Sequence, residues 1–140
     1  MSPNTLRTVI AIVLFVHAVG HVQGVMASVG LSTLENWHPR SWLFDNLLGE
    51  RASQTLAFVI WALCVLGFLA TTFAFLGIGI PHGIWRTLAM IFAGLSAVGL
   101  IFYWNSLTAL FNKIGAIGVN AGILIGLLML NWPSESEIGF

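Results

Sequence analysis

The chain has 140 residues, of which 58% are apolar and only 7% are charged, and its mean hydropathy is +0.94. Soluble domains carry about 25% charged residues, so the composition excludes an ordinary soluble protein. The formal net charge is zero and no basic run is present, which argues against nucleic acid as a partner. The single cysteine, Cys64, excludes an intrachain disulfide and dithiol chemistry.

The charged residues are spaced so that they leave four charge-free runs. Each run reaches the roughly 20 residues that a helix needs to cross about 30 Å of hydrocarbon. We therefore predict an all-α fold, with one membrane domain over residues 1–140 that forms a bundle of four transmembrane helices in the lipid bilayer. The predicted spans are residues 6–28, 55–76, 82–104 and 114–132. With four spans, both termini are expected on the same side of the membrane.

The long connection between the first two spans contains an apolar segment, SWLFDNLL, which predicts a short helix. Ser41 is a suitable N-cap for this helix and Gly49 is a suitable stop. The segment is too apolar to lie free in water. It is expected either to lie at the bilayer interface or to pack as a structured loop over the helix ends.

The strongest local pattern is HAVGHVQG in the first span. His17 and His21 are four residues apart, and so are Gly20 and Gly24, so that all four share one helical face. An unpartnered imidazole in lipid is costly, so this face is expected to point into the bundle. The glycines leave room for another group beside the rings. These four residues are therefore the main candidates for a ligand-binding site.

Two aromatic residues from other spans are further candidates for this site. Trp61 lies near one face of the second span together with Cys64, and Tyr103 ends the third span beside Trp104. Interfacial anchoring is an equally adequate explanation of Tyr103. Cys64 has no cation nearby in the sequence that would activate it, so it is expected to be a small buried residue.

The HxxxH spacing also allows one metal ion to bind both imidazoles, which makes His17 and His21 candidate metal ligands. No carboxylate lies inside a predicted span, so a third ligand has to come from the connections: Glu35, His38, Asp45, Glu50 or His82. A structural role for the two histidines and a contact with a lipid-soluble ligand remain alternatives to the metal. The sequence identifies no cofactor.

Glycines form a stripe along the fourth span. Gly118, Gly122 and Gly126 are four residues apart, and Gly115 lies one turn earlier. Stripes of this kind bring membrane helices into close contact. The partner is expected to be another helix of this chain, with a second copy or another membrane subunit as the alternative. Asn120 lies off the stripe and is placed to bond a different neighbour.

Three segments, HAVGHVQG, WHPRSWLF and FYWNSL, together with the lengths and spacing of the spans, define the overall pattern of the chain. This pattern resembles small bacterial four-helix integral membrane proteins with the layout of the DoxX-like families. The resemblance implies a multi-pass protein of the inner (plasma) membrane and brings no assigned reaction.

The sequence favours an accessory subunit or a binder of a hydrophobic small molecule, in which His17 and His21 line an interhelical cavity. The main alternative is a membrane-embedded redox or metal-dependent enzyme that uses the same histidines. A small transporter is a further alternative, although no intramembrane charge is present to couple it to ions. An enzyme would need a third ligand beside the pair, whereas a subunit would need an exposed apolar face.

Overall fold

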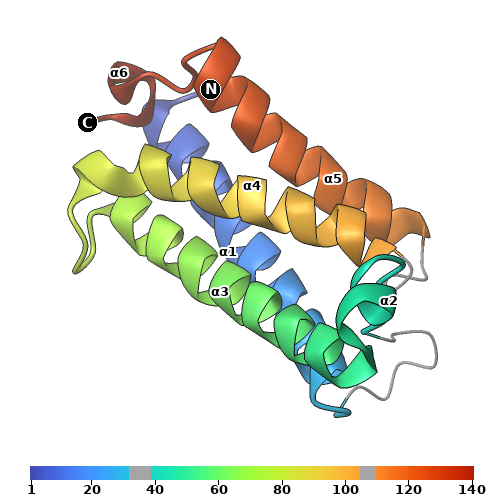
Figure 1. The fold of residues 1–140 in the computed structure, drawn as a ribbon. Helices are drawn as coiled ribbons and strands as arrows, with labels where there is room; N and C mark the ends of the chain where they lie inside the picture. The colour runs from blue at the N-terminus through green and yellow to red at the C-terminus, as the bar shows by residue number, and fades with distance from the viewer. Residues whose placement is uncertain (32–38, 105–109) are drawn as a thin grey trace.

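The structure, a computed structural model, describes residues 1–31, 39–104 and 110–140, and it contains only helices and turns within these ranges (Figure 1). The longer helices are α1 (Pro3–Ser28), α3 (Glu50–Leu76), α4 (Trp85–Phe102) and α5 (Leu110–Leu124). The shorter elements are α2 (Phe44–Leu48), the 3-10 turn η1 (His82–Ile84), the π-helical turn η3 (Ile125–Met129) and α6 (Glu135–Ile138).

Within the described residues, three helical segments are long and apolar enough to cross a membrane. They are Pro3–Ser28, Glu50–Leu76 and His82–Phe102, and a shorter apolar helix covers Lys113–Met129. Each of the four predicted spans therefore corresponds to an apolar helix. The all-helical fold class is confirmed for the described residues, and the helix bounds differ from the predicted ones mainly at the ends.

The first two spans begin earlier than predicted because helical structure extends into their polar ends. The Ser2 side chain accepts a hydrogen bond from the Thr5 amide, at 3.2 Å, and thereby caps α1. Helix α3 begins directly after Gly49, whose φ of +80° favours glycine and separates α3 from α2. The first turn of α3 therefore includes Glu50 and Arg51, which precede the charge-free run.

The fourth span ends earlier than predicted. The helix becomes π-helical over Ile125–Met129, and Asn131 then adopts a positive φ of 49°. The Trp132 amide donates to the carbonyl of Gly126, at 2.8 Å, so the chain folds back on the end of its own helix. Residues 131 and 132 consequently form a turn.

The predicted short helix in the first connection is present as α2. Ser41 Oγ accepts a hydrogen bond from the Phe44 amide, at 3.0 Å, and donates to the carbonyl of Phe102, at 2.8 Å. Trp42 Nε1 donates to the carbonyl of Ile101, also at 2.8 Å. These bonds satisfy carbonyls at the C-terminal end of α4, which otherwise have no helical partner. The α2 segment thus packs over helix ends.

The helices pack in the order α1, α3, α4 and α5, and α6 lies against α1 (Figure 1). Among the glycines of the described helices, Gly24, Gly67 and Gly99 lie where a neighbouring helix approaches closely. A Cβ at Gly67 would lie 2.2 Å from the Phe92 ring, and at Gly24 it would lie 2.7 Å from the ring of Trp61. At these positions a missing side chain allows an aromatic ring of a neighbouring helix to fill the space.

The glycine stripe of the fourth span does not form such a contact, and the expectation that it packs within this chain is wrong. A Cβ at Gly115, Gly118 or Gly122 would have no described atom within 4 Å. Helix α5 instead turns Asn120 toward the bundle, and Asn120 is only 1% exposed. Gly126 is buried, but it is covered by the backbone of Trp132 rather than by another helix.

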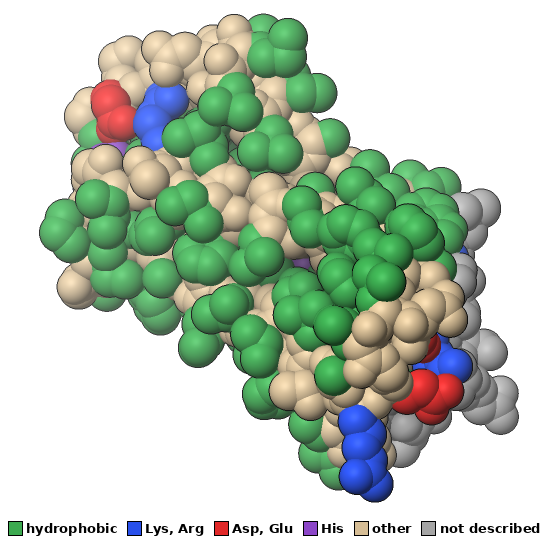
Figure 2. Space-filling view, in the orientation of Figure 1, with side chains coloured by type: hydrophobic (Ala, Val, Ile, Leu, Met, Phe, Trp, Pro, Cys, Tyr) green, Lys and Arg blue, Asp and Glu red, His purple; other side chains and the backbone are tan. Residues whose placement is uncertain are grey.

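Charged groups gather at two opposite ends of the molecule, with an apolar surface between them (Figure 2). At one end, Arg86 Nε lies 3.7 Å from Glu135 Oε1, and the Arg7 guanidinium lies over the Phe140 ring. At the other end, Arg40 forms an ion pair with Asp45. This distribution is typical of a protein whose middle lies in hydrocarbon.

Candidate functional site

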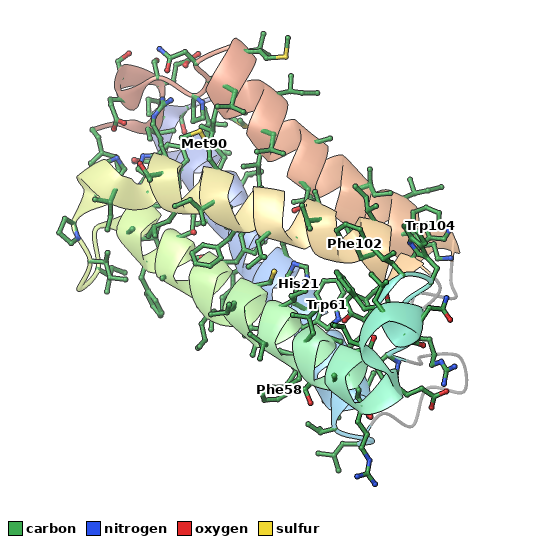
Figure 3. All side chains as sticks on the ribbon, in the orientation of Figure 1. His21, Phe58, Trp61, Met90, Phe102 and Trp104 are labelled. Atoms are coloured by element: carbon green, nitrogen blue, oxygen red, sulfur yellow. The ribbon has the colours of Figure 1, made fainter. Side chains whose placement is uncertain are left out.

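The two histidines of α1 project into the bundle, as their spacing predicts. His17 is 9% exposed and His21 is 6% exposed, whereas the neighbouring Val16 is 60% exposed. One face of α1 therefore packs against the other helices, and the opposite face is exposed and apolar. Figure 3 shows His21 beside Trp61 of α3 in the middle of the molecule.

The two imidazoles are linked by side chains from two other helices. His17 Nε2 lies 2.9 Å from Asn120 Oδ1 of α5, and Asn120 Nδ2 donates to Ser96 Oγ of α4, at 2.8 Å. Ser96 Oγ lies 3.2 Å from His21 Nε2. These four side chains, which we call the histidine network, join α1, α4 and α5 by a continuous chain of hydrogen bonds.

Aromatic rings of α3 pack against the histidine network. The His21 ring is stacked with Trp61 (centroids 5.5 Å apart) and with Phe68 (5.7 Å), both at an interplanar angle of 15°. The His17 ring makes an edge contact with Phe68, at 4.6 Å, and with His21, at 4.7 Å. Both rings are therefore held in fixed orientations by contacts on several sides.

A pocket of about 490 Å³ lies beside the histidine network, between α1 and α5. Its volume is in the usual range for small-molecule sites, about 300 to 1,000 Å³. The polar part of its lining comes from the two histidines and Gln23. The other lining residues are Ile12, Val13, Val16, Gly20, Gly24, Trp61, Leu100, Gly115, Ala116 and Val119.

Several of the lining residues on α1, including Ile12, Val16 and Gly20, are exposed on the apolar outer surface. The pocket therefore communicates with the surroundings sideways, through the gap between α1 and α5. In a bilayer this direction leads into the hydrocarbon. A molecule dissolved in the lipid would reach the histidines without passing through water.

Of the predicted ligand-binding residues, all except Tyr103 line the pocket. These are His17, His21, Gly20, Gly24 and Trp61. Gly20 leaves open space there, because a Cβ at this position would have nothing within 4 Å, whereas Gly24 makes room for the Trp61 ring.

Tyr103 is not among the residues that line the pocket. It is fully buried, and its hydroxyl donates to the carbonyl of Ser53, at 2.7 Å. Its ring makes an edge contact with Trp61, with centroids 6.4 Å apart. Tyr103 therefore packs against Trp61. It also joins the C-terminal end of α4 to the N-terminal end of α3.

The candidate third metal ligands lie elsewhere wherever the structure describes them. His82 Nε2 is 2.8 Å from Glu135 Oε2, at one end of the molecule. Asp45 and Glu50 both pair with Arg40 at the other end. Among the described residues no three His, Cys, Asp or Glu side chains are close enough to hold a metal ion.

The remaining two candidate ligands, Glu35 and His38, lie outside the described residues.

The predicted site residues do not include Asn120 or Ser96. Both are almost completely buried, at 1% and 0% exposed, and both are uncharged polar residues within otherwise apolar helices. That polarity was the available signal, since a buried polar group in lipid needs a partner. Polarity alone does not identify the histidines as their partners.

Comparisons of the chain with protein-family models, with curated proteins and with solved structures find no match.

Proposed function

We propose that this protein is a multi-pass membrane protein that binds a hydrophobic small molecule in the pocket between α1 and α5. The observation that carries the proposal is the pocket itself, which opens sideways through an apolar surface and has two histidines in its wall. Polar side chains inside a membrane protein are functional candidates by default. Here they lie beside space that the chain does not fill.

The proposed topology has four membrane-crossing helices. Besides the three long apolar helices, the continuous helical stretch Leu110–Met129 reaches about 30 Å at a rise of 1.5 Å per residue. Charged side chains gather at the two ends (Figure 2), which supports the same arrangement. The four-helix layout that the sequence resembles makes the inner (plasma) membrane the proposed compartment.

The depth of the site supports a lipid-soluble ligand. His17 lies close to the midpoint of α1, so in this topology its ring is near the middle of the bilayer. A water-soluble substrate would have to cross half of the hydrocarbon to reach it. A molecule with a long apolar part and a small polar group matches both the lining and the depth.

Photolabelling tests the proposal. The purified full-length protein is placed in phosphatidylcholine vesicles with a long-chain alkyl diazirine that carries a small polar end group, and labelled residues are identified by mass spectrometry. We expect saturable labelling of pocket residues such as Ile12 and Val119, and competition by the same molecule without the diazirine. Labelling spread evenly over the lipid-facing helices, without competition, would overturn the proposal.

A matched pair of variants separates binding in the pocket from dissolution in the lipid. Gly20→Phe places a ring in the open space of the pocket, whereas Gly118→Phe places the same ring on an open surface that does not line it. We expect Gly20→Phe to abolish saturable labelling and Gly118→Phe to preserve it. Equal labelling of the two variants would show that the pocket is not the binding site.

A further inference from the structure

The histidine network determines what the two imidazoles can offer to a ligand. Each ring uses its Nε2 atom for the bond to Asn120 or Ser96, which leaves the Nδ1 atom of each ring for another partner. A neutral imidazole has one nitrogen that carries a proton and one that has a bare lone pair. The neutral form is the relevant one, because a charge at this depth is expensive.

The chain of hydrogen bonds has a direction, since an amide oxygen only accepts and an amide nitrogen only donates. In the arrangement of the structure, His17 Nε2 donates to Asn120 Oδ1, and Asn120 Nδ2 donates to Ser96 Oγ. The Ser96 hydroxyl then has its own proton left to donate to His21 Nε2. The Nδ1 atom of His17 therefore has no proton and can accept a hydrogen bond, whereas the Nδ1 atom of His21 carries a proton and can donate one.

The other assignment of the network, in which Asn120 Oδ1 and Nδ2 exchange places and both imidazoles take the other tautomer, reverses every bond in the chain. His21 Nε2 then donates to Ser96 Oγ, the Ser96 hydroxyl donates to Asn120 Oδ1, and Asn120 Nδ2 donates to a bare His17 Nε2. The two Nδ1 atoms exchange roles, so that His17 now carries the proton and His21 the lone pair. In either direction the pair presents one donor and one acceptor.

The two Nδ1 atoms belong to rings that line the pocket. Neither has a hydrogen-bond partner among the described residues, and both rings belong to the pocket wall. In the described part of the chain, the side-chain atoms that are both buried and unpaired are Ser53 Oγ and Trp85 Nε1. The two Nδ1 atoms are unpaired but are not among these fully buried atoms. A partner for them would therefore lie in the pocket.

We infer that the ligand's polar group is a hydroxyl, which accepts a hydrogen bond from one imidazole and donates one to the other. This inference rests on the proposed function and names the ligand class: an alcohol or phenol that is otherwise apolar. The ring centroids are 4.7 Å apart, which places a single oxygen within reach of both rings. An ether, a ketone or a quinone only accepts, and would leave the bare nitrogen without a partner.

Three probes test the inference with the same alkyl diazirine chain, ending in a hydroxyl, a methyl ether or a methyl ketone. Each is titrated into vesicles that contain the full-length protein, and saturable labelling of the pocket gives an apparent affinity. We expect the alcohol to bind about five- to tenfold more tightly than the other two, the factor expected for one ordinary hydrogen bond. Equal affinities would overturn the inference but leave the proposed function standing.

Variants show whether the preference comes from the histidine network. Asn120→Leu removes the side chain that couples the two rings, and Ser96→Ala does the same with a smaller change of volume. We expect both to reduce the preference for the alcohol to less than twofold while saturable labelling persists. His82→Gln, a change at the end of the molecule, is the control and should keep the full preference.

The outcomes separate the two claims. No saturable labelling by any of the three probes overturns the proposed function together with the inference. A preference for the alcohol that survives in both Asn120→Leu and Ser96→Ala overturns the role of the histidine network. The wild-type comparison requires no variant, so the inference stays testable even if one of the substituted proteins does not fold.

Discussion

Gly20 and Gly24 are one turn apart on the same face of α1, yet the structure uses them differently. Gly24 faces the Trp61 ring, which also lies against Gly99 of α4, so that Trp61 fills the space between three helices. Gly20 faces the open pocket. Gly24 therefore serves packing, and Gly20 serves access to the histidines. The local sequence around the two glycines does not distinguish these roles.

This difference predicts opposite effects of the same substitution. In Gly24→Ala the new Cβ would lie 2.7 Å from the Trp61 ring, and relieving such overpacking costs about 1 to 3 kcal/mol. In Gly20→Ala the new Cβ meets nothing, and the better helical propensity of alanine should raise the free energy of unfolding by about 0.5 to 1 kcal/mol. Unfolding in detergent measures both values. Equal destabilisation by the two variants would contradict the assigned positions of the glycines.

Helix α5 is the element whose orientation departs most from the sequence-based expectation. Its glycines pointed to a close helix contact, but the helix uses Asn120 and apolar neighbours such as Ile123 to face the bundle. A buried hydrogen-bonding residue constrains the rotation of a helix, because turning it toward lipid would leave its amide unpaired. The stripe at Gly115, Gly118 and Gly122 is left on the surface as a consequence.

We therefore expect Gly122→Leu to leave the thermal midpoint of the isolated protein unchanged. The new side chain would extend into open space, because a Cβ at this position has no described neighbour within 4 Å. The measurement is thermal unfolding in detergent, at a dilution where the chain is monomeric. A lower midpoint would mean that the glycine stripe packs against another helix after all.

The short helix α6 has its own pH-dependent contact. Ser134 and Glu137 form a capping box, in which the Ser134 amide donates to Glu137 Oε2, at 2.7 Å, and the Ser134 hydroxyl also donates to it, at 2.8 Å. These bonds favour the ionised carboxylate and hold the pKa of Glu137 below its ordinary value of 4.5, with the backbone bond as the larger cause.

Because this pKa is lowered in the folded state, the contribution of the capping box is fully present above the ordinary pKa of 4.5. It is lost as the pH falls through the lowered value. We expect protection of the Ser134 amide against hydrogen exchange to decrease in that acidic range. In Glu137→Gln the protection should no longer vary with pH. A wild-type protection factor that stays constant through the acidic range would contradict this prediction.

At the scale of the whole molecule, both termini lie at the same end. The Arg7 guanidinium lies 4.0 Å from the centroid of the Phe140 ring, and that ring is stacked on His82, with centroids 3.6 Å apart. Arg86 also bonds Asn131 and the carbonyl of Pro133. The C-terminal segment is thus held against the start of α1 and the start of α4, and it joins the first and last helices at that end.

This arrangement predicts that cysteines introduced at Ser2 and Ser136 are labelled from the same side of a sealed membrane. The native Cys64 is fully buried, so a membrane-impermeant maleimide should not label it. The two cysteines can therefore be introduced without first replacing Cys64. Labelling of the two positions from opposite sides would rule out an even number of crossings.

The sequence by itself determined the all-α fold class, the apolar helices and the inward direction of His17 and His21. Composition and charge spacing settle whether a segment can lie in hydrocarbon, and a four-residue spacing places two side chains on one helical face. These are local properties, set by neighbours along the chain. The short helix that follows Ser41 was predictable for the same reason.

Only the tertiary structure decided which side chains meet the histidines and which glycines make contact. Asn120 is 103 positions from His17, and Ser96 is 75 positions from His21. Whether such distant residues meet depends on how each helix is rotated about its axis. That rotation is settled by the requirement that all helices bury their polar groups together, so no single span contains enough information to predict it.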